Sequence, residues 1–312
     1  MGQKAVARLR TVKTDSLEWT HVSSTNKETI AKLRTLYRFH PLDLRDIEPP
    51  LQRPKVVVRD GYLFMILLYP VFDKKTKELR VSEVDFFIAK DHLITVNTDH
   101  LQALDSLFHS CSKTSTKKQH VCLSGDISQL LYAILNDLMS AVYPKIVRMQ
   151  ADMDELETEL KDISNKKLIS DILRLKLNVM NARQAMQGHK NVMPKLLEIA
   201  PEYFVLDGLK IYYDELVRDS LEVWDALELQ KETIEAIHET NKTLIDFHTN
   251  DIIKTLTIFS VIVFPLTLLA AMFGMNVPVP FDHHPHGFWL ITGIMLAGSF
   301  AMLLYFKHKK WI

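Results

Sequence analysis

The chain has 312 residues, enough for two domains, and its 38 Lys and Arg are balanced by 38 Asp and Glu. This zero formal charge gives no reason to expect a nucleic acid as the partner. The two cysteines, Cys111 and Cys122, form no CxxC pair, which excludes a zinc knuckle, and we expect reduced thiols. Because the sequence contains no phosphate-cradling Gly loop, HExxH or GxSxG motif, it does not indicate an enzyme.

Residues 1–120 carry strand patterns flanked by helix patterns. β-branched and aromatic residues fill the stretch 55–72, in which Asp60-Gly61 provides the turn of a hairpin. Two more strands are expected within 78–97, and helical patterns lie at 25–39 and near 98–110. We therefore expect an α/β or α+β cytosolic domain over residues 1–120.

Residues 121–250 are expected to form a helical stalk. A long helical pattern runs from Leu131 to Ile163, after the capping sequence Ser-Gly-Asp at 124–126. The stretch 163–170 predicts a break, and a further helix is expected to end near Val192, before Pro194.

A heptad seam follows in the same stalk, because its members are separated by alternating steps of four and three residues. These members are Leu209, Tyr213, Leu216, Ser220, Val223, Leu227, Gln230, Ile234, Ile237, Asn241, Leu244 and His248. Four of them, Ser220, Gln230, Asn241 and His248, are polar, which argues against a dry two-stranded zipper. Such residues either fix the register of the helices or face water near an axis.

Residues 251–312 are expected to form a transmembrane domain. Neither Thr255–Phe273 nor Phe288–Phe306 contains a charged residue, and each helix would span about 28 Å, near the thickness of a bilayer core. We place the spans at about 252–273 and 288–306, with an external loop at 274–287 between them. The alternative, a buried helical hairpin in a soluble core, is disfavoured because such runs rarely occur there in tandem.

The flanks of the two spans predict their orientation. A basic tail with Lys307, Lys309 and Lys310 follows the second span, and Lys254 precedes the first. The external loop carries neither Lys nor Arg. Because cytoplasmic flanks are enriched in these residues, both termini are expected in the cytoplasm of a multi-pass protein.

The first span has one face of amide, hydroxyl, small and apolar groups, and Pro265 within it invites a bend. Steps of three and four place the following residues on that face: Asn250, Ile253, Leu256, Ser260, Phe264, Thr267, Ala271 and Gly274. Such a face suits the lining of a narrow pore, and it equally suits a contact between helices built on small residues.

The end of the first span resembles the CorA family of magnesium and divalent metal ion transporters. The resemblance is carried by Gly274-Met275-Asn276, by the Pro-Leu-Thr step at 265–267 and by the lysine-rich tail at 305–312. The whole arrangement is also similar to that family: an α/β cytosolic domain followed by a long α-helical stalk and two transmembrane helices. The N-terminal half is matched by pattern alone.

This resemblance implies a homopentamer in the cell membrane, surrounded by lipid, in which the first span lines a central pore. It implies passive Mg²⁺ influx driven by the membrane potential. Gly274, Met275 and Asn276 are then the selectivity filter, and the face named above, from Asn250 to Ala271, lines the pore. Neutral oxygens suit a hydrated Mg²⁺, which gives up its water reluctantly, whereas the ordinary alternative for Asn276 is a helix C-cap.

The family also has acidic sites between subunits, where bound cytosolic Mg²⁺ closes the pore. By position along the helix, the stalk candidates are Glu215, Asp219 and Asp214, and the candidates in the N-terminal domain are Glu83 and Asp85. A solvated acidic face is the alternative for each of them. The family's stalk ligand is commonly Asp, so Glu215 departs from the pattern.

The external loop does not identify the transported ion, because His283, His284 and His286 suit softer cations such as Zn²⁺. Zinc or broad divalent transport, including Co²⁺ and Ni²⁺, is therefore the alternative within the family. A non-conducting coiled-coil adaptor anchored in the membrane is the alternative from another class of protein.

Overall fold

The computed structural model describes residues 9–14, 17–99, 101–112, 125–160, 166–206, 208–275 and 286–311. They divide into two units, Met1–His238 and Glu239–Ile312, which are considered separately. The domain boundaries predicted near residues 120 and 250 stay predictions.

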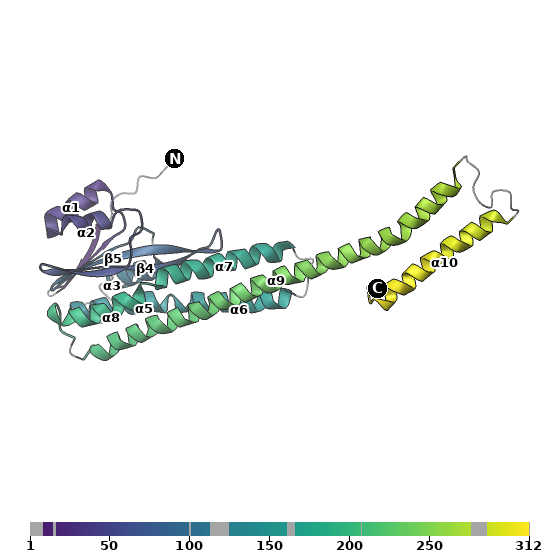
Figure 1. The fold of residues 1–312 in the computed structure, drawn as a ribbon. Helices are drawn as coiled ribbons and strands as arrows, with labels where there is room; N and C mark the ends of the chain where they lie inside the picture. The colour runs from purple at the N-terminus through teal and green to yellow at the C-terminus, as the bar shows by residue number, and fades with distance from the viewer. Residues whose placement is uncertain are drawn as a thin grey trace. The chain divides into compact units, whose positions relative to one another are not determined.

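The first unit is built on a six-stranded sheet with the order β1-β2-β6-β5-β4-β3 (Figure 1). Its strands are β1 (Leu9–Lys13), β2 (Glu18–Val22), β3 (Lys55–Arg59), β4 (Tyr62–Asp73), β5 (Glu78–Ala89) and β6 (His92–Val96). β2 and β6 are parallel, whereas the other neighbouring pairs in this sheet are antiparallel. The hairpin predicted at Asp60-Gly61 is confirmed, since Gly61 has the positive φ of 82° that such a turn requires.

One face of the sheet is covered by α1 (Lys27–Tyr37) and α2 (Pro41–Asp46). α1 begins where it does because the side chain of Asn26 accepts a hydrogen bond from the backbone N–H of Thr29 at 2.8 Å. The smaller of two buried clusters lies on this face, and Phe87 of β5 stacks in it on Phe39, with ring centroids 4.1 Å apart.

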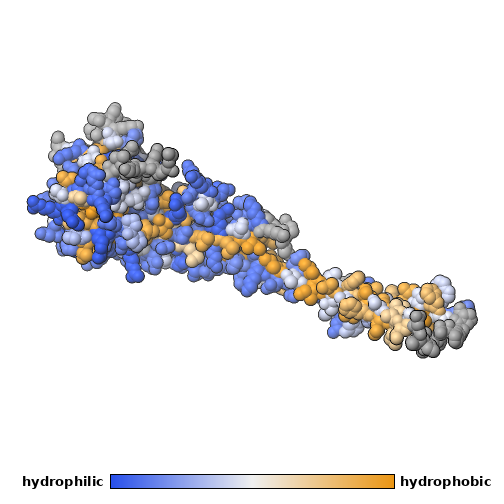
Figure 2. Space-filling view, turned by 90° about the horizontal axis from the view of Figure 1, so that it is seen from above, coloured by the Kyte–Doolittle hydropathy of each residue, from blue (hydrophilic) through white to orange (hydrophobic). Residues whose placement is uncertain are grey.

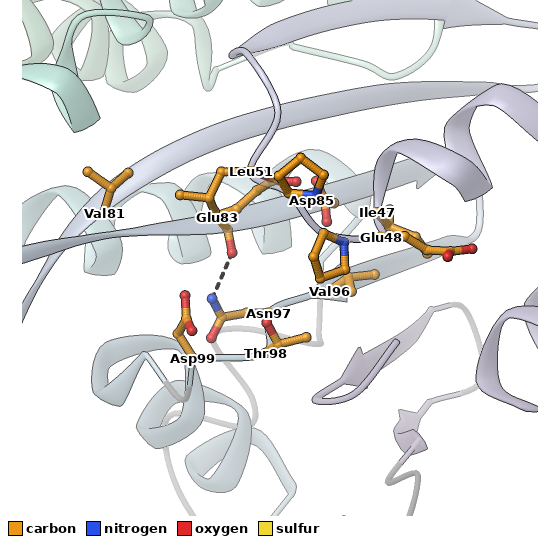
Figure 3. A pocket seen from close by; sticks show the side chains of 12 residues that line it. Ile47, Glu48, Leu51, Val81, Glu83, Asp85, Val96, Asn97, Thr98 and Asp99 are labelled. Carbon is orange, nitrogen blue, oxygen red and sulfur yellow. Dashed lines mark hydrogen bonds between the residues drawn. The ribbon is translucent and has the colours of Figure 1, made fainter. Parts of the chain in front are cut away.

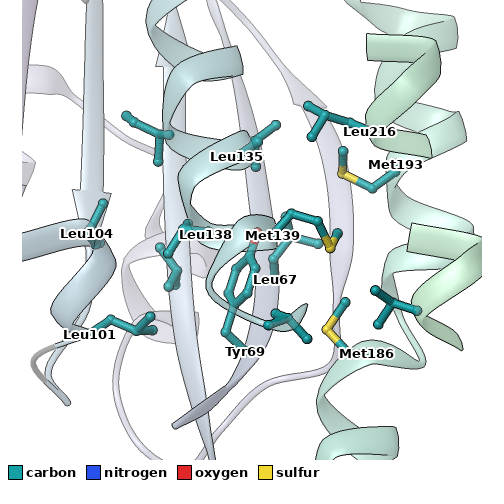
Figure 4. Close-up of a cluster of buried hydrophobic side chains, with 14 of the residues drawn as sticks. Leu67, Tyr69, Leu101, Leu104, Leu135, Leu138, Met139, Met186, Met193 and Leu216 are labelled. Carbon is teal, nitrogen blue, oxygen red and sulfur yellow. The ribbon is translucent and has the colours of Figure 1, made fainter. Parts of the chain in front are cut away.

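The opposite face is covered by the remaining helices of the unit, around the larger cluster (Figures 1 and 4). These elements are α3 (Gln102–Ser112), α5 (Ile127–Ser140), α6 (Tyr143–Glu159), α7 (Lys166–Met186), α8 (His189–Ile199) and the short 3-10 helix η1 (Ala200–Glu202). Figure 4 shows side chains from β4, α5, α8 and the following helix α9 meeting in this cluster. Cys111 is buried there in α3, whereas Cys122 lies outside the described residues.

Polar contacts fix α7 and α8 against the sheet. The amide oxygen of Asn178 accepts from the backbone N–H of Leu79 at 2.8 Å, and Asn181 donates to the carbonyl of Leu79 at 2.7 Å. Gly188, between the two helices, lies so close to Pro54 that an added Cβ would be 2.2 Å from that ring. The absence of a side chain at Gly188 therefore lets α8 begin directly against the segment that leads into β3.

The helix α9 (Lys210–Phe273) is continuous for 64 residues, about 96 Å at the rise of an α-helix. Its seam residues from Tyr213 to Ile237 are buried against helices of the same chain. Gln230 donates to the carbonyl of Ile146 in α6 at 2.9 Å, and Tyr213 donates to the carbonyl of Ser128 in α5 at 2.8 Å. In this part of the chain, the polar seam residue Gln230 therefore fixes the register of α9 and does not face water.

Two predictions about the stalk are wrong. The pattern predicted as one helix from Leu131 is divided into α5 and α6, because Pro144 in the first turn of α6 has no N–H with which to continue α5. α7 ends at Met186 and α8 continues through Pro194, where burial of Val192 and Leu196 outweighs the hydrogen bond that proline removes.

The second unit contains the C-terminal part of α9 and the helix α10 (Gly287–His308). Both are long and apolar enough to cross a membrane, and their most apolar windows are 0% and 6% buried. The α5–α6 segment also meets the length and composition criteria, but 44% of its window is buried in the first unit. Figure 2 shows the contrast between the apolar C-terminal helices and the largely polar surface of the first unit.

Candidate ion pathway and acidic sites

The hydroxyl groups on the predicted pore face of α9 donate to the helix backbone. Ser260 Oγ donates to the carbonyl of Leu256 at 2.8 Å, and Thr267 Oγ1 donates to the carbonyl of Val263 at 2.9 Å. Because each hydroxyl proton is used within the helix, the remaining lone pairs of the oxygen are left to accept hydrogen bonds. Both oxygens are therefore suited to the water shell of a cation.

The apolar residues of the same face are exposed in the single chain. The exposed fractions are 54% for Ile253, 62% for Leu256 and 71% for Phe264. Residues on other faces of α9, such as Phe259 and Leu268, are equally exposed. Exposure alone therefore does not select the face that would line a pore.

The membrane part of α9 ends at Phe273, immediately before Gly274. The backbone N–H of Gly274 donates to the carbonyl of Ala270 at 3.0 Å, and a Cβ added at Gly274 would lie 3.2 Å from that oxygen. This tight fit favours glycine. Met275 is 57% exposed, and Asn276, together with the external-loop residues His283 and His284, lies outside the described residues.

The acidic residues predicted on the stalk lie near the start of α9. Asp214 pairs with Lys210 at 3.0 Å, and Glu215 is exposed. Asp219 lies beside Tyr143, whose pKa is raised to about 12, first by burial and then by the charges of Asp219 and Glu222. Of these three carboxylates, that of Glu215 is the exposed one.

The acidic residues predicted in the N-terminal domain, Glu83 and Asp85, lie on β5 and line a pocket of about 430 Å³ (Figure 3). Both belong to the sheet face that α1 and α2 cover, because Phe87, two residues farther along the strand, packs in the smaller cluster. Asp85 is only 3% exposed, and the Glu83 carboxylate accepts from the backbone N–H of Gln52 at 2.5 Å.

Burial is the main reason that both carboxyl groups bind protons more tightly than usual. The pKa of Asp85 is raised well above its ordinary value by burial first and by the neighbouring charge of Glu83 second. Burial also raises the pKa of Glu83, although the N–H of Gln52 partly opposes this effect. Two carboxyl groups in such surroundings favour either a shared proton or a bound cation.

Among the residues that the structure describes, no three His, Cys, Asp or Glu side chains form a group that could hold a metal ion. Three partners in the pocket, Glu48, Asn97 and Asp99, were not predicted. They come from segments far apart in the sequence, so no local spacing signals their proximity.

The fold joins an α/β unit to exposed apolar helices long enough to cross a bilayer, which defines a membrane protein. A model of the CorA-like Mg²⁺ transporter protein family matches residues 14–308. The chain therefore belongs to this family of membrane transporters, and α9 and α10 provide its transmembrane helices.

Individual relatives agree with this assignment over nearly the whole chain. The cobalt/magnesium transport protein CorA of Thermotoga maritima is 22% identical over 300 residues, which cover 94% of this chain and 83% of the relative. The protein of the same description from Methanocaldococcus jannaschii is 22% identical over 262 residues, 83% of this chain and 80% of the relative. The complete structure of the CorA magnesium transporter from Methanocaldococcus jannaschii has the same fold, with a TM-score of 0.81 and 21% identity over 96% of this chain and 94% of that chain.

Proposed function

We propose that this chain is the subunit of a divalent-cation channel that admits Mg²⁺ passively into the cell. The observation that carries the proposal is the unbroken course of α9 from Lys210 to Phe273. In a continuous helix, steps of three and four residues keep one polar and small-residue face aligned as far as Gly274. Membership of a divalent-cation transporter family supports the class of cargo.

The polar groups of that face suit an ion that keeps its water. Mg²⁺ binds water at 2.0–2.1 Å and dehydrates reluctantly, and conduction requires sites from which the ion can leave. The oxygens of Ser260 and Thr267 can accept hydrogen bonds from the water shell. We assign the outer filter to Gly274, Met275 and Asn276, in which neutral oxygens avoid the tight binding of a carboxylate ring.

The same face carries a candidate gate. Ile253 and Leu256 are neighbours of the polar Asn250 on this face, and both expose more than half of their surface in the single chain. When several copies bring such side chains around a narrow axis, the constriction excludes water and blocks the ion. We propose that this ring closes the pore, which Phe264 and Ala271 continue to line.

The membrane potential supplies the driving force. An ion of two charges gains about 4.6 kcal/mol for each 100 mV that it crosses inward, so no nucleotide site is required. We propose a homopentamer in the cell membrane with both termini in the cytoplasm, surrounded by lipid. In that assembly the basic flanks, Lys254 and Lys307–Lys310, meet the anionic inner surface.

Closure at high internal Mg²⁺ is proposed to involve Glu215, with Asp214 and Asp219 beside it. Glu215 is exposed near the start of α9, so a cation can bind it together with a neighbouring subunit. This binding would hold subunits together when cytosolic Mg²⁺ is abundant and would release them when it is scarce.

Flux into liposomes tests the proposal. The purified full-length protein is reconstituted, and Mg²⁺ entry is followed with an internal dye under an inward-negative potential, with Co²⁺, Ni²⁺ and Zn²⁺ in parallel. We expect Asn276→Ala to abolish flux or its selectivity while the oligomer still forms. Thr292→Ala is the matched control, because the Thr292 hydroxyl donates to Phe288 within α10 and lies outside the proposed pore face.

Each result of this assay has a consequence. Unchanged Mg²⁺ entry through Asn276→Ala would remove Asn276 from the filter. Faster entry of Zn²⁺ than of Mg²⁺ would identify Zn²⁺ as the cargo. Vesicles that remain impermeable to every divalent cation tested would favour the membrane-anchored adaptor.

A further inference from the structure

An acidic pocket in the first unit has a lining without Lys, Arg or His among the described residues. It lies between the segment after α2 and the strands β5 and β6 (Figure 3). Its acidic lining residues are Glu48, Glu83, Asp85 and Asp99. A cavity with four carboxyl groups and no basic side chain concentrates negative potential, which attracts a cation.

Asp85 is the decisive residue in this pocket. It is 3% exposed, and its Oδ1 has no hydrogen-bond partner among the described residues. Its neighbours across the sheet, Ile66 on β4 and Val96 on β6, are apolar. Because an unpartnered buried carboxylate oxygen is costly, Asp85 is stabilised either by a proton shared with Glu83 or by a bound cation.

Two basic side chains of β3, which pairs with β4 in the same sheet, are engaged with other acids. Lys55 pairs with Asp46, and Arg59 makes two hydrogen bonds to the buried Asp43. Glu83 receives the backbone N–H of Gln52 on one oxygen. None of these contacts reaches the Oδ1 atom of Asp85.

We infer that this pocket is a cation site within each single chain, where Asp85 and Glu83 hold one hydrated divalent cation of the Mg²⁺ type. Mg²⁺ is commonly bound by one or two carboxylates and retains several waters, so two acidic ligands suffice. Six waters occupy roughly 180 Å³, which the pocket of about 430 Å³ accommodates. The hydroxyl of Thr98 and the carboxylate of Asp99 line the same pocket and can accept from those waters.

This inference differs from the sequence-based hypothesis for the same residues. There, Glu83 and Asp85 were candidates for a site shared between subunits and completed by Glu215. Here the ligands and the lining come from one chain, so binding requires neither a neighbouring subunit nor a conducting pore. The cation site can therefore be tested independently of the proposed transport.

Counting bound Mn²⁺ tests the inference, because Mn²⁺ takes the same oxygen ligands and its free form is quantified by electron paramagnetic resonance. The full-length protein in detergent is titrated at about pH 8, since a bound metal must displace protons from carboxyl groups. We expect Asp85→Asn and Glu83→Gln each to bind one Mn²⁺ fewer per chain than wild type. Glu78→Gln, which removes one charge from the same strand outside the pocket, should bind as many as wild type.

An unchanged Mn²⁺ count in Asp85→Asn would overturn the inference and assign a shared proton to the pair. If that variant fails to fold, crystals of the wild-type protein grown with Mn²⁺ decide the question. An anomalous difference peak beside Asp85 supports the site, and its absence overturns it. Because neither measurement involves flux, a failed transport assay would leave this result unaffected.

Discussion

Acidification should destabilise the first unit through His189. This residue is fully buried, its Nε2 donates to the carbonyl of Leu68 at 2.7 Å, and its ring packs edge-on against Tyr69 with centroids 4.9 Å apart. The Nδ1 atom has no partner among the described residues, so a proton there would be buried without compensation. Burial accordingly lowers the pKa of His189 from 6.5 to about 4, although the bond to Leu68 opposes this effect.

The sign and size of the effect follow from this difference. In the unfolded chain His189 takes up a proton as the pH falls below 6.5, whereas in the folded chain it stays neutral until about pH 4. The neutral histidine therefore contributes stability that is present above pH 6.5 and is lost as the pH falls toward 4. Between about pH 7.5 and about pH 4.5 the loss amounts to roughly 2 to 3 kcal/mol.

Urea unfolding of the full-length protein in detergent, followed by tryptophan fluorescence, measures this effect, since Trp19 is buried in the same unit. His189→Gln is the control, because glutamine can donate to Leu68 but does not titrate. Carboxylates contribute to the pH dependence of both proteins, so the informative quantity is the difference between them. The free energy of unfolding of the wild type should fall by roughly 2 to 3 kcal/mol more than that of the variant. Parallel pH profiles would refute the assignment of His189 as the buried titrating group.

Three further changes test the packing and the regulation. Gly188→Ala should destabilise the first unit by about 1 to 3 kcal/mol, because the new Cβ would lie 2.2 Å from Pro54. The midpoint of urea unfolding measures this loss of stability. An unchanged midpoint would contradict the close approach of the two residues. Gln230→Ala should cost about 1 to 3 kcal/mol, because it removes the bond to the carbonyl of Ile146 and leaves a cavity at a buried position. Thr233→Ala, at a half-buried site on the same helix, should cost far less. Glu215→Lys should weaken the inhibition of flux by internal Mg²⁺. The control is Glu232→Lys, a matched change at another exposed position of α9. Equal inhibition in both variants would exclude Glu215 from the regulatory site.

The local signals in the sequence predicted much of the fold. Asp126 caps α5 by accepting from the N–H of Gln129 at 3.1 Å, as the Ser-Gly-Asp sequence indicates. The strands around Asp60-Gly61 pair in the expected hairpin. β1 and β2 were not predicted, and β2 is specified by its parallel pairing with the distant β6.

The candidate site was predicted less completely. Spacing identified one face of α9, and the resemblance identified its end at Gly274, since both depend on residues close together in the sequence. The pocket around Asp85 could not be predicted, because its lining joins the segment after α2, β5 and the residues after β6. The periodicity of a sequence does not indicate which loop will cover a given strand.

The sequence by itself determined the two membrane helices and the heptad seam of α9, because uncharged runs and heptad spacing act within one segment. Only the tertiary structure decided which helices bury the seam of α9 and which segments surround Glu83 and Asp85. Periodicity places Gln230 on the seam, but its burial and its partner, Ile146, depend on how distant segments pack. In the same way, Asp85 becomes a buried acid with an unpartnered Oδ1 only when the sheet and the segment after α2 come together, which is a property of the folded chain.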